Sequence, residues 1–194
     1  MDYYSKVIPM SLLKNYISND PIIDWINLQN IHQVYYKKDK NNYFYNYILV
    51  YTTRYKEYFF KNIEDKIKEI IPDLELHKYS DEITTINLIH SNYPVIIKPK
   101  ILNKKYNISV SVDILIKKYL FKKIFSDIKN ININTIDDNY YLSINIIPQI
   151  VSFKADNKTL QSNDIINYNQ CELYVFNNAL KLYEIKRDNI GFIC

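Results

Sequence analysis

The residues best suited to chemistry lie in two apolar stretches that predict β-strands. From Tyr106 to Ile116 alternate positions are apolar, and Asp113 shares the opposite face with Ser109 and Ser111, because side chains alternate along a strand. An acid on the polar face of an apolar strand is a better site candidate than an aspartate in a loop. We therefore take Asp113 as the centre of a candidate site.

The second stretch, Tyr141 to Ile147, places Asn145 and Ile147 on one strand face. Two positions separated by one residue are the spacing needed by a metal-binding acid and a lysine that orients the attacking water. Asparagine brings no negative charge to a divalent cation, which prefers anionic oxygens. Isoleucine cannot donate a proton or position a water. The pattern predicts the geometry of a metal site from which catalytic groups have been lost.

Composition excludes several classes of function. A single glycine, Gly191, is too few for the glycine-rich loops that hold phosphates in P-loop and Rossmann proteins. Two cysteines without a CxxC pair argue against a zinc site or disulfide scaffold and favour a reducing compartment. The first residues lack the apolar core of a signal peptide, and no run reaches the roughly 18 apolar residues of a membrane span. We expect an intracellular protein without a membrane partner.

Lysines flank Asp113 with no other acid between them, and the net charge of +4 permits an anionic partner. Such a run could follow a phosphate backbone and bind DNA in a salt-dependent, sequence-independent way. The alternative is that these lysines are solvated strand ends in a chain rich in Lys, Asn and Ile. The candidate nucleic-acid-binding residues are Lys98, Lys100, Lys104, Lys105, Lys117 and Lys118, and the run continues with Lys122 and Lys123.

The elements that must position these residues follow from periodicity. A long helix is predicted over 43–71, with Phe60, Ile63 and Ile67 on its apolar stripe. Glu64 lies beside that stripe, either as a solvated flank residue or as an acid directed into a site. A second helix is predicted over 165–183, with a buried stripe of Ile166, Leu173, Phe176 and Leu180.

Shorter elements complete the expected domain. Helices are predicted over 9–18, after Asp20-Pro21, over 81–93 and over 119–125; strands are predicted over 74–79, 95–102, 106–116, 141–147 and at the end of the chain. No linker divides the sequence, so we expect one domain over 1–194, with a helical N-terminal cap (1–42) and a core (43–194). The order of long helix, three strands, helix and strand predicts an α/β or α+β sheet with packed helices.

Six stretches, in this order and spacing, resemble the PD-(D/E)XK nuclease-like proteins of giant DNA viruses, of the λ-exonuclease and YqaJ viral-recombinase type. The stretches are NYISNDPIIDWINL, NIEDKIKEII, TTINLIHSNYPVIIKPKIL, SVSVDILIKKYL, YYLSINIIPQIVSFKADNKTL and NYNQCELYVFNNAL. The resemblance implies a restriction-endonuclease-like core, with a central mixed sheet of about four strands flanked by helices.

The resemblance also assigns roles to residues. The implied catalytic positions are Glu64 (helical acid), Asp113 (first strand acid), Asn145 (a degenerate acid), Ile147 (a degenerate lysine) and Glu172 (near the helical glutamine). It implies that Glu64, Asp113 and Asn145 converge, and that Glu64 and Asp113 would hold Mg²⁺ or Mn²⁺ if metal is still bound. Otherwise no cofactor is expected.

We therefore expect a viral nuclease-fold protein that is catalytically inactive and retains nucleic-acid binding or a protein-interaction role, in the host cytoplasm or the virion. One alternative is an active Mg²⁺-dependent DNA nuclease with a displaced lysine, for which Lys154 and Lys158 are available. Another is a structural or virion-interaction protein that reuses the fold.

Overall fold

The structure is a computed structural model that describes residues 7–17, 43–78, 81–126, 137–147, 164–185 and 187–193. The described helices are η2 (Met10–Leu13, a 3₁₀ turn), α1 (Lys14–Ile17), α4 (Tyr43–Ile70), α5 (Glu82–His90), α6 (Lys118–Ile124) and α7 (Asp164–Leu182). The described strands are β1 (Ile8–Pro9), β2 (His77–Lys78), β3 (Val95–Ile97), β4 (Lys100–Asn103), β5 (Ile108–Ser111), β6 (Ile114–Lys117), β7 (Tyr141–Asn145) and β8 (Arg187–Ile193). The helix predicted after Asp20-Pro21 lies outside the described residues.

A five-stranded mixed sheet in the order β2-β3-β6-β7-β8 forms the centre of the fold. The central strand β6 is antiparallel to both of its neighbours, β3 and β7, whereas β2 is parallel to β3 and β8 is parallel to β7. A second sheet, in the order β1-β5-β4, lies beside it. The mixed α and β structure agrees with the predicted class of helices packed on a sheet.

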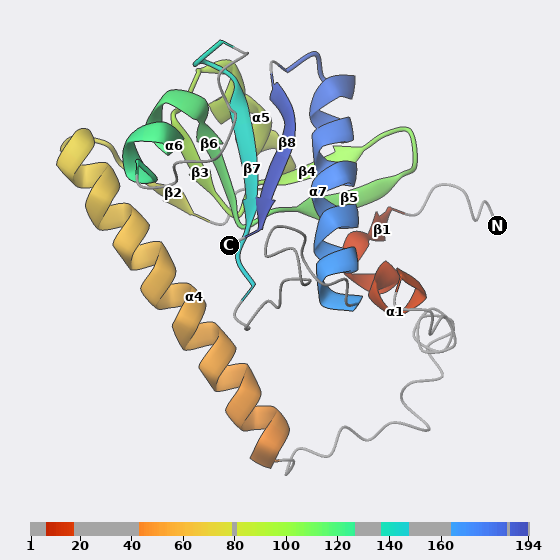
Figure 1. The fold of residues 1–194 in the computed structure, drawn as a ribbon. Helices are drawn as coiled ribbons and strands as arrows, with labels where there is room; N and C mark the ends of the chain where they lie inside the picture. The colour runs from red at the N-terminus through yellow and green to blue at the C-terminus, as the bar shows by residue number, and fades with distance from the viewer. Residues whose placement is uncertain are drawn as a thin grey trace, which may run out of the picture.

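The five-stranded sheet is buried on both faces, and α4 and α7 lie on opposite sides of it (Figure 1). Along β7, Leu142 and Ile144 join the core formed with α4 and α6, which we call the α4-side core. Tyr141 joins the core formed with α7, the α7-side core. Strand alternation therefore directs Ser143 and Asn145 of β7 toward α7, where their side chains make hydrogen bonds.

The long helix α4 packs on the sheet through its second half. Ile63 and Ile67 are buried, and Phe60 and Ile70 are partly buried against the same core, as the predicted stripe requires. The first half extends beyond the sheet (Figure 1). The residues that begin the packed half therefore lie at the edge of the sheet, where a polar side chain can reach a site.

Two strands predicted to be continuous are each divided between the two sheets. The chain leaves β3 at Lys98-Pro99 to enter β4, and it leaves β5 at Val112-Asp113 to enter β6. The breaks are adjacent, since the Lys98 N–H donates to the Asp113 carbonyl at 2.9 Å and the Val112 N–H donates to the Pro99 carbonyl at 3.4 Å. The prediction of one strand over 106–116 was wrong, and Asp113 lies at the junction of the sheets.

Other predicted elements are confirmed. The long helix corresponds to α4, the second helix to α7 with all four predicted stripe residues buried, and the strand after residue 140 to β7. The turn over 104–107 joins the antiparallel strands β4 and β5 in a hairpin. Within the described residues, no helix is both long and apolar enough to cross a membrane.

Candidate functional site

Asp113 is held by groups from two other elements. Its Oδ2 atom accepts a hydrogen bond from the Lys56 ammonium on α4 at 2.8 Å and another from the Ile146 N–H, just after β7, at 2.8 Å. Only 13% of the Asp113 side chain is exposed. The carboxylate is therefore a fixed, largely shielded charge with a cation directly against it.

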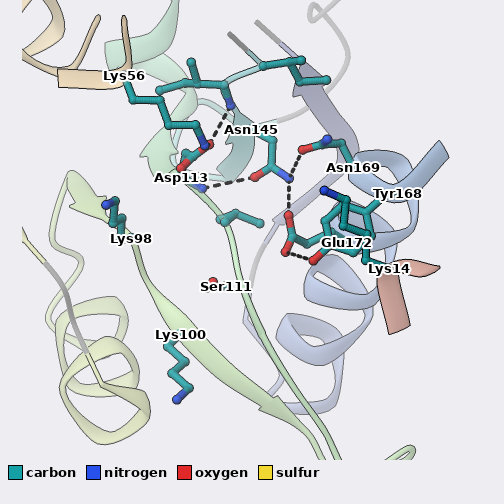
Figure 2. A pocket seen from close by; sticks show the side chains of 13 residues that line it. Lys14, Lys56, Lys98, Lys100, Ser111, Asp113, Asn145, Tyr168, Asn169 and Glu172 are labelled. Carbon is teal, nitrogen blue, oxygen red and sulfur yellow. Dashed lines mark hydrogen bonds and ion pairs between the residues drawn. The ribbon is translucent and has the colours of Figure 1, made fainter. Parts of the chain in front are cut away.

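Asn145 connects this acid to α7 (Figure 2). Its Oδ1 accepts from the Asp113 N–H at 3.2 Å, and its Nδ2 donates to Glu172 Oε2 at 2.7 Å and to Asn169 Oδ1 at 3.1 Å. Because only the NH₂ end of an amide offers two donors, these two acceptors fix the orientation of the side chain. The buried Asn145 therefore presents hydrogens, rather than an oxygen, to the helical acid.

Glu172 receives a second hydrogen bond from the Tyr168 hydroxyl to Oε1, at 3.0 Å. Burial raises the pKa of Glu172 above its ordinary value, and the charge of Asp113 adds to this, while Tyr168, Asn145 and Lys56 oppose it. Burial, together with the carboxylate of Glu172, also raises the pKa of the Tyr168 hydroxyl. Glu172 therefore takes up a proton more readily than an exposed glutamate does.

These groups line a cavity of about 560 Å³ that also receives four lysines from three segments of the chain. The lysines are Lys14 on α1, Lys56 on α4, Lys98 between β3 and β4, and Lys100 on β4. Lys98 and Lys100 lie across the opening from Tyr168 and Glu172 (Figure 2). Four ammonium groups against two carboxylates give this lysine cavity a net positive charge, which favours an anionic ligand.

Four of the five implied catalytic positions line this cavity. Asp113, Asn145, Ile147 and Glu172 all contribute to its wall, and Ile147 is 4% exposed. The side chain at the position of the lysine is therefore a buried apolar group. Lys154 and Lys158, which were available as displaced lysines, lie outside the described residues.

Glu64 is placed elsewhere. Its carboxylate accepts from Lys78 at 2.8 Å and from Lys68 at 3.0 Å, and the pKa of Glu64 is lowered by these hydrogen bonds. It lines a different cavity and lies eight residues beyond Lys56, a rise of about 12 Å along α4. The expected convergence therefore holds for Asp113 and Asn145 but not for Glu64.

Two of the candidate DNA-binding lysines are buried. Lys117 is 5% exposed and Lys118 is 0% exposed. The Lys117 ammonium donates to the Asn139 carbonyl at 2.7 Å and to Asn92 Oδ1 at 3.2 Å, and it lies 4.0 Å from the centroid of the Tyr141 ring. These side chains lie in the interior of the protein. The prediction that they contact a nucleic-acid backbone was therefore wrong.

The remaining candidates divide into two groups. Lys98 and Lys100 line the lysine cavity, as described above. Lys104 and Lys105 belong to the turn between β4 and β5 and are not among its lining residues; their ammonium groups lie over the rings of Tyr183 and Tyr106, 4.6 and 5.1 Å from the centroids. Only the first group is placed to act with Asp113.

Sequence reasoning missed Lys56, whose ammonium group lies 2.8 Å from Asp113 Oδ2. A signal was present, because Lys56 lies one turn before Phe60 on the helical face that continues through Ile63 and Ile67. A charged residue that extends a buried stripe is directed toward the sheet rather than into solvent. Tyr168 carried a similar signal, one turn before Glu172 on α7.

The arrangement does not fit a divalent cation. Mg²⁺ and Mn²⁺ take oxygen ligands, but an ammonium group already lies against Asp113 and an amide NH₂ faces Glu172. Among the residues that the structure describes, no three His, Cys, Asp or Glu side chains come together. The donors present suit a negatively charged ligand better than a metal ion.

Comparisons of this chain with protein-family models, with curated proteins and with solved structures give no match.

Proposed function

We propose that this protein binds nucleic acid through the lysine cavity and that the nuclease-like site within it is catalytically inactive. The observation that carries this proposal is the set of four lysines around Asp113 and Glu172, two acids whose oxygens already accept internal hydrogen bonds. Lysine binds phosphate as a point charge, without demanding one orientation. Such a surface gives salt-dependent binding with little sequence preference.

The source of the lysines favours an extended ligand. Lys14 and Lys100 are exposed, Lys98 is half-buried, and Lys14 comes from a different segment of the chain than Lys98 and Lys100. A single phosphate would need these groups to converge on one point, whereas a nucleic-acid strand presents a charge at every nucleotide. Lysines distributed around an opening therefore suit a backbone that passes across it.

The arrangement of the core supports a relation to PD-(D/E)XK nuclease-like proteins. The elements α4, β3, β6, β7, α7 and β8 follow the order of long helix, three strands, helix and strand, and they form a mixed sheet between helices. Asp113 and Asn145 meet as the resemblance implies. Glu64 does not converge with them, which counts against the relation, and Asn145 and Ile147 depart from it in residue type. The relation therefore rests on the order of the elements and on the contact between Asp113 and Asn145.

Binding can be tested by fluorescence anisotropy with labelled DNA over a range of salt concentrations. We expect the logarithm of the affinity to fall linearly with the logarithm of the salt concentration, and Lys14→Ala or Lys100→Ala to lower that slope by roughly 0.7–0.9 each. Lys123→Ala is a matched control, because Lys123 is exposed on α6 and lies outside the cavity.

Two results would contradict the proposal. An equal loss of affinity in the control would mean that binding depends on overall charge and not on the lysine cavity. No binding at low salt would leave the structural or virion-interaction alternative.

Metal-dependent DNA cleavage is a second candidate, favoured by one contact. Lys56 lies 2.8 Å from Asp113, so it could serve as the displaced lysine that an active site would need. The test is incubation with linear and with circular DNA in Mg²⁺ or Mn²⁺. Cleavage that disappears in Asp113→Ala would show that the site is catalytically active. Intact DNA under all conditions supports binding alone.

A further inference from the structure

We infer that the Lys56 ammonium takes the place of a divalent cation at Asp113, so that the lysine cavity binds phosphate groups without metal. The part of this inference that concerns phosphate rests on the proposed function. The part that concerns metal rests on the geometry around Asp113 alone, and it can be tested without nucleic acid.

Lys56 is positioned by the packing of α4. The helix is held on the sheet by Ile63 and Ile67, and the ring of Phe60 packs against the same core. Lys56 extends this stripe toward Asp113, and the ion pair is partly shielded, with 34% of the lysine and 13% of the aspartate side chain exposed. The cation is thus supplied by the fold itself and is present before any ligand binds.

The second acid, Glu172, is held separately by hydrogen bonds from neutral donors. A metal ion shared between Asp113 and Glu172 would meet the NH₂ of Asn145, which points at Glu172 Oε2 from 2.7 Å. Turning the amide to offer its oxygen would break the hydrogen bonds to Asp113, Asn169 and Glu172. The loss of such a bond destabilises the protein, and the effect is larger when a buried group is left unpaired. The amide of Asn145 therefore opposes a metal ion beside Glu172, and Lys56 makes a metal ion beside Asp113 unnecessary.

Dissolved Mg²⁺ should then act only as a counterion that competes for DNA. Because binding to lysines releases cations from the phosphate backbone, added Mg²⁺ should weaken binding by the wild-type protein. A site that held its ligand through a metal ion would respond in the opposite direction.

The direct test is a titration with Mn²⁺ alone, followed by electron paramagnetic resonance. We expect no stoichiometric Mn²⁺ binding by the wild-type protein and the gain of one site when Lys56→Met is combined with Asn145→Asp, because this double variant removes both the ammonium group at Asp113 and the amide hydrogens at Glu172. Adding Asp113→Asn to the double variant should abolish the gain. Lys98→Met with Asn145→Asp is the matched control: it removes a lysine from the same cavity but leaves Lys56 on Asp113, so it should gain no site.

The wild-type titration keeps the inference testable even if the double variant fails to fold, which thermal unfolding would reveal; Lys56→Gln with Asn145→Asp is then the second neutral variant. Stoichiometric Mn²⁺ binding by the wild-type protein that is lost in Asp113→Asn would overturn the inference, and so would a folded double variant that binds no Mn²⁺. DNA binding that persists in EDTA and weakens in Mg²⁺ supports the phosphate part. No DNA binding in either condition would remove the proposed function and leave the metal result standing.

Discussion

Asn145 lies between two carboxylates, and its amide hydrogens determine how they coexist. An aspartate of the same shape would put an oxygen where Nδ2 now lies, 2.7 Å from Glu172 Oε2 and 3.1 Å from Asn169 Oδ1. Without a metal ion to bridge them, those oxygens would repel one another. The amide is therefore a structural part of the present network and not only a lost acid.

The stability of the protein should depend on pH through Glu172. Its pKa is raised in the folded state, mainly by burial, so the folded protein holds a proton where the unfolded chain has released it. The free energy of unfolding should therefore fall as pH rises from the ordinary value of 4.5 through the raised value, by up to about 1.4 kcal/mol per pH unit for one proton. Urea unfolding at a series of pH values measures this slope.

Two variants separate Glu172 from other acids. Glu172→Gln cannot titrate, so its unfolding free energy should lack this contribution. Glu64→Gln is the control: the pKa of Glu64 is lowered by Lys78 and Lys68, so its contribution is lost as pH falls and has the opposite sign. A slope that survives in Glu172→Gln would show that another group is responsible.

The sequence identified the acids of the site better than their partners. Asp113 and Glu172 were predicted from strand alternation and from the resemblance, and both line the cavity. Lys56 was missed because it lies 57 residues from Asp113 in the chain and meets it only through the packing of α4. Lys117 and Lys118 were predicted wrongly because a lysine-rich run contains no information about which side chains fold inward.

At the scale of elements, periodicity predicted the helices but not the division of two strands. Val110 and Val112 pack in the α7-side core, whereas Ile114 and Ile116 pack in the α4-side core. The apolar alternation thus runs unbroken through Asp113 although the chain changes sheet there. A pattern that records burial alone cannot indicate which of two cores a side chain enters.

The contact between α7 and β8 depends on the single glycine of the chain. A Cβ atom at Gly191 would lie 3.1 Å from Leu173 Cδ1 and 3.2 Å from Leu173 Cβ. Leu173 is 5% exposed and follows Glu172 on α7. The absence of a side chain on β8 therefore sets how closely the helix that holds Glu172 approaches the sheet.

Gly191→Ala should lower the free energy of unfolding by about 1–3 kcal/mol, because a buried side chain must be displaced to admit the methyl group. Leu173→Ala alone should cost about 2–5 kcal/mol through the cavity that it leaves. The double variant should lose less stability than the sum of the losses in the two single variants, since the truncated side chain makes room for the methyl group. Urea unfolding of all four proteins measures the coupling; additive costs would mean that the added methyl group does not contact Leu173.

At the scale of the whole molecule, the candidate site lies where the two sheets meet. The chain crosses this junction twice, and the crossings place Lys98 and Asp113 side by side through the hydrogen bond from the Lys98 N–H to the Asp113 carbonyl. Lys98 adopts a left-handed backbone conformation, with φ of 51°. Residues other than glycine pay for that conformation, so the molecule keeps a cation at the site at a cost in stability.

Substitution at Lys98 should separate these two effects. Lys98→Ala and Lys98→Gly both remove the ammonium group, so both should weaken DNA binding equally and lower the salt slope by roughly 0.7–0.9. Only glycine relieves the backbone, so Lys98→Gly should be more stable than Lys98→Ala by about 1 kcal/mol. Anisotropy and urea unfolding of the two variants provide the comparison. Unequal DNA affinities of the two variants would assign binding to the backbone at the junction rather than to the lysine side chain. An alanine variant as stable as the glycine variant would mean that the backbone at Lys98 is unstrained.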